Sequence, residues 1–305
     1  MLWVLYEQIW LRKDLPELWQ LFLLRFTAAN EGWLIAALLL VAVNWGIETE
    51  KWRLLMLRAA HIPFWQAFKA VLAGVTFAVF TPNRIGEYGG RLLMVRVDKW
   101  QTFIATVVSS VSQMIVLIGV GSIGAMGYVV SRYALPAYWL WSGAAAGAVG
   151  VTLLLMLYFN IDLIIPLIAR LPYLRRGVKH LTVLQEYSTA RLVRVLLLSA
   201  ARYSVYSLQY YLLLRFFGIE VSVIQGFTYI AFLFFLQTVL PLPPVSALLL
   251  RGELAVQVWG TYSHNPLSIF AVSFGLWFIN LALPAIFGMI FIMSSNVTRN
   301  LGYDD

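Results

Sequence analysis

The chain of 305 residues has no cysteine and few charged residues, and each of these shortages excludes some classes of protein. Without cysteine it can form no disulfide, no thiolate metal site and no thiol redox centre. Charged residues make up 12% of the chain, whereas soluble domains contain about 25%. The three histidines are scattered without metal-ligand spacing, so we expect no metal and no cofactor. Nucleophile-elbow, Walker-lysine and zinc-helix motifs are also absent from the sequence.

The sequence is rich in long runs of apolar residues. Hydrophobic residues make up 61% of the chain, and the mean hydropathy is +0.79. Several windows of about 20 apolar residues follow one another, and each could cross a hydrocarbon core of roughly 30 Å. We therefore predict an all-α polytopic integral membrane protein. The net charge of +8 fits a basic cytoplasmic side facing anionic headgroups, and we expect no nucleic-acid partner.

The apolar runs divide the chain into five predicted segments. They are an N-terminal interfacial segment (1–30), a first repeat (31–131), a linking span with a basic cytoplasmic loop (132–194), a second repeat (195–293) and a tail (294–305). The first predicted span opens at Trp33, and the others cover 103–130, 136–159, 195–217 and 266–293. Two further apolar segments, which we call arms, cover 64–80 and 222–240. Each arm ends at a proline break followed by a short polar return, which is typical of a re-entrant hairpin.

The stretch Thr81–Arg91 carries three charges between two apolar runs. An ionised side chain at the bilayer centre costs roughly 2.5–3.5 kcal/mol on insertion scales, so charges at such a position favour a functional site. In the second half, the corresponding polar return follows Pro241, and it carries Arg251 and Glu253.

Local similarities relate the two halves. Gln66-Ala67-Phe68 pairs with Gln225-Gly226-Phe227, and Pro82 pairs with Pro241 at the same offset. If neither hairpin crosses the membrane, three spans separate equivalent points, and the halves are inverted. Inverted repeats with paired broken helices are typical of transporters whose site lies near the midplane. Basic residues near Lys51–His61 and in the loop 162–194 predict that both lie on the cytoplasmic side.

The hairpin tips have the composition of an anion site. A helix that begins after the proline points free N–H groups and its positive dipole end at the tip, where arginine can bind phosphate through paired hydrogen bonds. The glutamates could pair with the arginines or take up protons. The predicted substrate-binding residues are Arg84, Glu87, Arg91, Arg251 and Glu253, and the predicted hairpin-shaping residues are Pro82, Gly86, Gly89, Gly90, Pro241, Pro243 and Pro244. The alternative is a buried ion-pair network that only fixes the hairpins.

The stretch Thr81–Arg91 resembles the proline–x–Arg–x–Gly–Glu–x–x–x–Arg signature of the lysylphosphatidylglycerol synthase transmembrane family. The resemblance covers roughly Trp33 to Met293. The second return departs from the family pattern, because Val245-Ser246-Ala247 stand where members usually have glycines. The resemblance implies lipid translocation or handling of a lipid-linked substrate in the bacterial inner membrane, with a membrane phospholipid or a polyprenyl-phosphate-type lipid as partner.

Our first hypothesis is a lipid flippase or scramblase-like transporter with a midplane site between the hairpins. Only about a dozen residues follow the last predicted span, so we expect no aminoacyltransferase domain and no enzyme activity of that type. The alternatives are a membrane transferase acting on a lipid-linked phosphate, with Glu87 as base, and a non-transporting membrane partner of a separate soluble protein. Homo-oligomerisation is left open.

Overall fold

The computed structural model describes residues 15–26, 28–56, 61–81, 84–95, 97–160, 182–238 and 247–295. All regular structure within these ranges is helical, which confirms the predicted all-α class. The predictions for Pro82, Pro241, Pro243 and Pro244 lie outside the described residues.

The helices follow the predicted order of span, arm, return and span in both halves. The first half contains α2 (Leu15–Leu23), α3 (Ala28–Met56), α4 (Phe64–Ala78), α5 (Gly86–Met94) and α6 (Lys99–Arg132). The linking span is α7 (Ala137–Phe159), and a short 3₁₀ turn, η5 (Thr182–Glu186), precedes the second half. That half contains α10 (Thr189–Phe216), α11 (Val223–Thr238), α12 (Ala247–Trp259), α13 (Pro266–Trp277), a π-helical turn η6 (Phe278–Ala282) and α14 (Leu283–Ser294).

Four helical stretches are long and apolar enough to cross a membrane. They are Asn30–Met56, Lys99–Arg132, Ala137–Phe159 and Pro266–Ser294. Helix α10 has 28 residues and carries four arginines along its length, and it is not among these four. Membrane crossing by α10 therefore remains a prediction. The last span is not the continuous α-helix that the sequence predicts, because the π-turn η6 interrupts it.

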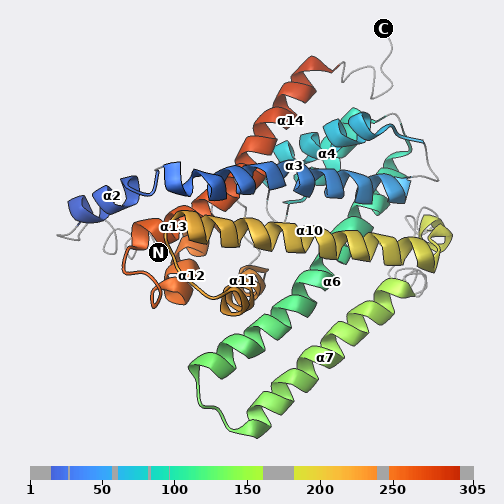
Figure 1. The fold of residues 1–305 in the computed structure, drawn as a ribbon. Helices are drawn as coiled ribbons and strands as arrows, with labels where there is room; N and C mark the ends of the chain where they lie inside the picture. The colour runs from blue at the N-terminus through green and yellow to red at the C-terminus, as the bar shows by residue number, and fades with distance from the viewer. Residues whose placement is uncertain are drawn as a thin grey trace.

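Helices α3 and α10 lie side by side and antiparallel at the centre of the molecule (Figure 1). Gln209 on α10 donates a hydrogen bond of 2.9 Å to the carbonyl of Ala37, near the start of α3. The Tyr187 hydroxyl, just before α10, donates one of 3.3 Å to the carbonyl of Leu55, at the opposite end of α3. The contacts thus run in opposite directions along the two helices, and one helix of this central pair comes from each half.

Each apolar arm packs on the last helix of the other half. Thr76 on α4 donates a hydrogen bond of 2.8 Å to the carbonyl of Ala285 on α14. Conversely, the hydroxyls of Tyr229 on α11 and Ser131 on α6 lie 2.9 Å apart. The two halves therefore exchange their arms. The inverted relation of the halves and the re-entrant course of the hairpins remain predictions.

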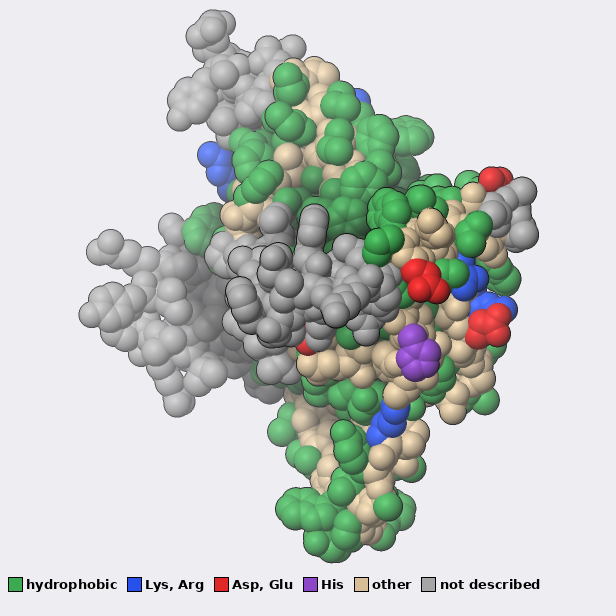
Figure 2. Space-filling model, turned by 90° about the vertical axis from the view of Figure 1, so that its left-hand side faces the viewer, with side chains coloured by type: hydrophobic (Ala, Val, Ile, Leu, Met, Phe, Trp, Pro, Cys, Tyr) green, Lys and Arg blue, Asp and Glu red, His purple; other side chains and the backbone are tan. Residues whose placement is uncertain are grey.

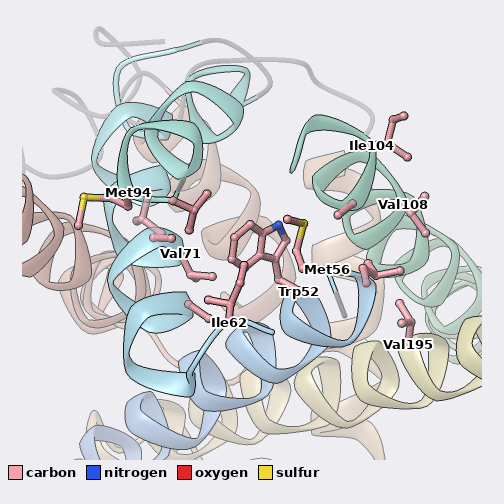
Figure 3. Close-up of a cluster of buried hydrophobic side chains, with 14 of the residues drawn as sticks. Trp52, Met56, Ile62, Val71, Met94, Ile104, Val108 and Val195 are labelled. Carbon is pink, nitrogen blue, oxygen red and sulfur yellow. The ribbon is translucent and has the colours of Figure 1, made fainter. Parts of the chain in front are cut away.

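Two separate clusters of buried side chains form the core. The first surrounds Trp52, which Figure 3 shows with Val71 and Met94 on one side and Ile104 and Val108 on the other. The second is rich in aromatic rings and belongs mainly to the second half, around Tyr210, Phe234 and Trp259. The first core thus packs around the first hairpin, and the second around α10–α13.

Helix α7 packs against α6 and exposes most of its surface. None of its most apolar 18-residue window is buried. Together the ends of α6 and α7 form the projection at the bottom of Figure 1, whose surface is largely hydrophobic in Figure 2. Trp139 and Trp141 are exposed near this end. An apolar exposed helix with tryptophans near one end is the expected form of a lipid-facing span.

Candidate functional site

Six charged side chains from α3, α10, α5 and the turn before α5 meet in one place, and we call them the charge network. Its members are Glu48, Lys51, Arg84, Glu87, Arg91 and Arg202. Glu48 is the central member, because its carboxylate lies 2.8 Å from Lys51, 2.9 Å from Arg91 and 3.1 Å from Arg202. The side chains of Lys51 and Arg91 are only 1% exposed, so these charges are removed from both water and lipid headgroups. Such burial is tolerated only when charges are paired.

The α5 part of the network is the part that the sequence predicted. Glu87 pairs with Arg91 one turn later, and with Arg84 at 3.2 Å. The predicted i,i+3 and i,i+4 pairing of Glu87 with the two arginines is thereby confirmed. Arg84 has φ of +59°, the one positive φ at a non-glycine residue in the described chain. A non-glycine residue in this region is strained, and such residues cluster at functional sites.

Close backbone contact between α4 and α5 holds the first hairpin in place. A Cβ on Gly74 would lie 2.9 Å from the carbonyl oxygen of Glu87, and one on Gly90 would overlap the carbonyl of Ala73. Gly86 likewise lies against the carbonyl of Phe77, whereas Gly89 has open space beside it. These contacts bring Glu87 and Arg91 to the face of α5 that meets α3.

The N-terminus of α5 is partly satisfied within the protein. The Gly86 N–H, at the first residue of α5, donates a hydrogen bond of 2.8 Å to the hydroxyl of Thr81. Anion binding at this tip therefore depends more on arginine side chains than on this backbone donor.

Tryptophan rings cover the arginines of the network. The Arg91 guanidinium lies 5.4 Å from the ring centroid of Trp52, and that of Arg202 lies 5.1 Å from the ring of Trp45. Trp52 is itself fixed by a hydrogen bond of 3.2 Å from its indole N–H to Thr106. Cation–π contact stabilises a buried arginine without occupying its N–H donors.

Polar side chains extend the network towards the last span. Arg202 donates a hydrogen bond of 3.1 Å to the Asn44 side-chain oxygen, and the Asn44 amide donates one of 2.7 Å to Asn280. Asn280 belongs to η6, the π-turn that interrupts the last span. Single π-turns within helices are frequent at functional sites. The network is therefore linked by hydrogen bonds to the one irregular turn of that span.

The network holds more positive than negative charge. Its four cations face two carboxylates, and no other carboxylate in the described part of the chain pairs with them. Three buried nitrogens of the network also have no hydrogen-bond partner among the described residues: Nε of Arg84, and Nε and Nη1 of Arg91. Unused arginine donors beside an excess of positive charge can bind an anion such as phosphate.

The predicted residues of the second return lie on α12. Among the described residues, no ion pair joins Arg251 or Glu253 to the charge network. Arg251 Nε and one Glu253 oxygen are buried without a hydrogen-bond partner, and the Gln257 amide lies 3.5 Å from the other Glu253 oxygen. A substrate-binding role for Arg251 and Glu253 remains a prediction. The described ranges contain no group of three or more His, Cys, Asp or Glu side chains that could hold a metal.

Sequence reasoning missed half of the network. Glu48 and Lys51 were interpreted as charges at the cytoplasmic end of the first span, yet both are buried. Arg202 was passed over as part of an apolar span. One signal was available, because an ionisable residue inside an apolar helix is by default a functional candidate with a partner to be named.

Comparison with known proteins identifies the family of the chain. A family model described as the lysylphosphatidylglycerol synthase TM region matches residues 9–288. No curated protein and no solved structure gave a match. The match and the apolar helices together show an integral membrane protein of a kind compatible with a lipid-related function. The chain therefore belongs to the lysylphosphatidylglycerol synthase TM region family.

Proposed function

We propose that the protein moves an anionic, phosphate-containing lipid across the bacterial inner membrane, with the headgroup passing the charge network. The observation that carries this proposal is the excess of buried positive charge beside unused donors of Arg84 and Arg91. A protein that needed these charges only for packing would gain by balancing them, because an uncompensated buried charge is strongly destabilising.

The two arginines differ in access, which suggests the order in which a headgroup meets them. The Arg84 side chain is 39% exposed, whereas Arg91 is enclosed behind it. Arg84 makes the first contact with the phosphate, and Arg91 receives it further inside. The acyl chains stay in the bilayer, so only the headgroup needs a polar path. Between transits, Glu87 holds both arginines in position.

The origin of the charges suggests how transport and conformational change are coupled. Glu48, Glu87 and Arg91 belong to the first half, and Arg202 belongs to the second. Alternating access in transporters of this type proceeds by movement of one repeat against the other around a fixed site. Such a movement would break the Glu48–Arg202 pair and free a cation for the phosphate.

The proposal is tested by translocation of fluorescent phospholipids in proteoliposomes. We expect wild type to move anionic lipids, and Arg84→Ala and Glu87→Gln to lose most of that activity while remaining folded. Arg53→Ala is the matched control, since Arg53 forms an i,i+3 pair with Glu50 at 2.8 Å but is 32% exposed and outside the network.

Wild-type rates in both network variants would overturn the assignment of the site. Absence of translocation by wild type for all lipids, with and without a proton gradient, would overturn the transporter function. In that case, product formation from labelled donors would test the membrane-transferase hypothesis.

A further inference from the structure

The charge network is unbalanced by two units. Arginine does not deprotonate in proteins, so Arg84, Arg91 and Arg202 each carry a full positive charge. Lys51 lies 2.8 Å from Glu48, and this contact favours the ammonium form of Lys51 at neutral pH. The two carboxylates each face at least two cations, which stabilises both as anions. Each cation contacts a carboxylate, but four cations share two carboxylates, so the network of described residues carries a net charge of +2.

We propose that the network binds a phosphomonoester dianion in preference to a phosphodiester or a zwitterionic headgroup. This inference rests on the proposed function for its assumption that the ligand is carried by a lipid. A terminal phosphate brings two negative charges near neutral pH, since its second pKa is roughly 6. It thereby neutralises the network completely. A phosphodiester would leave one charge uncompensated, and a zwitterionic headgroup would add a further cation.

The number of free donors agrees with the charge. Three buried nitrogens of Arg84 and Arg91 have no hydrogen-bond partner in the described chain. A phosphomonoester presents three terminal oxygens as acceptors, whereas a phosphodiester presents two. Arginine is also the side chain best suited to paired hydrogen bonds with such a group. Charge and hydrogen-bonding capacity thus favour the same ligand chemistry.

The preference is measured by ligand binding to the full chain in phosphatidylcholine nanodiscs. Phosphatidate and phosphatidylglycerol with identical acyl chains supply the monoester and the diester. We expect phosphatidate to bind about tenfold more tightly at pH 7, because one additional charge within a few ångströms of buried cations is worth at least that factor. At pH 5 the monoester becomes a monoanion, and the preference should disappear. Equal affinity at pH 7 would overturn the inference.

Two substitutions of Arg84 separate charge from shape. Arg84→Gln lowers the network charge by one, so we expect the preference for phosphatidate to fall to about threefold or less, in line with the smaller charge excess. Arg84→Lys keeps the charge and should keep most of the preference. Arg53→Gln, in the exposed pair with Glu50, should leave both affinities unchanged. An unaltered preference in folded Arg84→Gln would also overturn the inference.

Inorganic phosphate distinguishes the two sources of this chemistry. If phosphate displaces phosphatidate only at concentrations far above those of the lipid, a lipid headgroup is the ligand. If it competes at equal concentration, the site takes free phosphate. Either result preserves the dianion preference. Translocation of both lipids at equal rates without a binding preference would overturn this inference alone. Preferential binding without any translocation would instead overturn the proposed function.

Discussion

The two halves have similar arrangements of helices but bury different kinds of side chain. In the first half, the return helix α5 carries Glu87 and Arg91, which are buried and paired with each other, and Arg91 also pairs with Glu48 on α3. In the second half, α12 contributes Trp259, whose indole N–H donates a hydrogen bond of 3.2 Å to Tyr210 on α10. The same arrangement of central helix and return thus encloses ions in one half and neutral aromatic side chains in the other.

This difference suggests that the two halves have different roles although their helices are arranged alike. Ion pairs can exchange partners with an incoming anion, whereas a packed aromatic cluster resists rearrangement. The Tyr210 hydroxyl also lies 3.2 Å from that of Ser273, so its polar groups are satisfied internally. We interpret the first hairpin, together with Arg202 of α10, as the site of headgroup contact and the aromatic cluster of the second half as its rigid support.

The largest expected effect is loss of Arg91. Arg91→Ala leaves Glu87 without its closest partner and Glu48 with one cation fewer, all within a buried region. Breaking a buried pair in this way costs about 3–5 kcal/mol. We expect a large fall in the melting temperature in detergent and loss of translocation. A variant as stable as wild type would show that the network does not hold the hairpin.

A smaller loss of stability is expected from substitution of the glycines in the two return helices, α5 and α12. Gly90→Ala would press its methyl group into the backbone of α4, which cannot move easily, and overpacking of this kind costs about 1–3 kcal/mol. Gly252→Ala meets only the ring of Phe270, which can rotate, so a smaller loss is expected. Gly89→Ala is the matched control, because it has open space and gains helix propensity of up to about 1 kcal/mol. Equal melting temperatures for the Gly89 and Gly90 variants would contradict the close packing of α4 on α5.

The role of the aromatic cluster in the second half is tested by Tyr210→Phe. This change removes the hydroxyl that contacts Ser273 and Trp259 but keeps the ring. We expect a stability loss of about 0.5–1.5 kcal/mol, which is typical of one hydrogen-bonding group. Translocation at the wild-type rate per folded molecule should persist. A complete loss of transport in the folded variant would assign the aromatic cluster a direct role in transport.

The smallest effect on stability is expected at Arg251. Its side chain is partly exposed and forms no ion pair within the described chain, so Arg251→Ala should change stability by less than about 1 kcal/mol. Measuring translocation by the same variant tests its predicted substrate-binding role directly. A destabilisation as large as that of Arg91→Ala would remove the contrast between the halves.

Much of the fold was predictable because hydrophobic periodicity and proline breaks are local signals. The predicted spans and arms agree with the helices to within a few residues, apart from α10, which begins at Thr189 instead of residue 195. The π-turn η6 was not predicted, since it depends on how Asn280 meets Asn44 across the fold. Such a contact leaves no periodic trace in the sequence.

Half of the charge network could be predicted for the same reason. Arg84 and Arg91 each lie about one helical turn from Glu87, and all three residues belong to one signature. Glu48 and Arg202 are far apart in sequence, and only the antiparallel packing of α3 on α10 brings them to 3.1 Å. A charge at the end of a predicted span and a buried charge within one look alike until the packing is known.

The most direct test of the account is translocation of an anionic lipid by proteoliposomes containing Glu48→Gln or Arg202→Gln, with Arg53→Gln as the control. These two network residues come from opposite halves and were identified by the structure alone. The account predicts that both network variants fold but lose most of their transport, while the control keeps it. Transport at the wild-type rate in both folded network variants would contradict the claim that the charge network is the headgroup site.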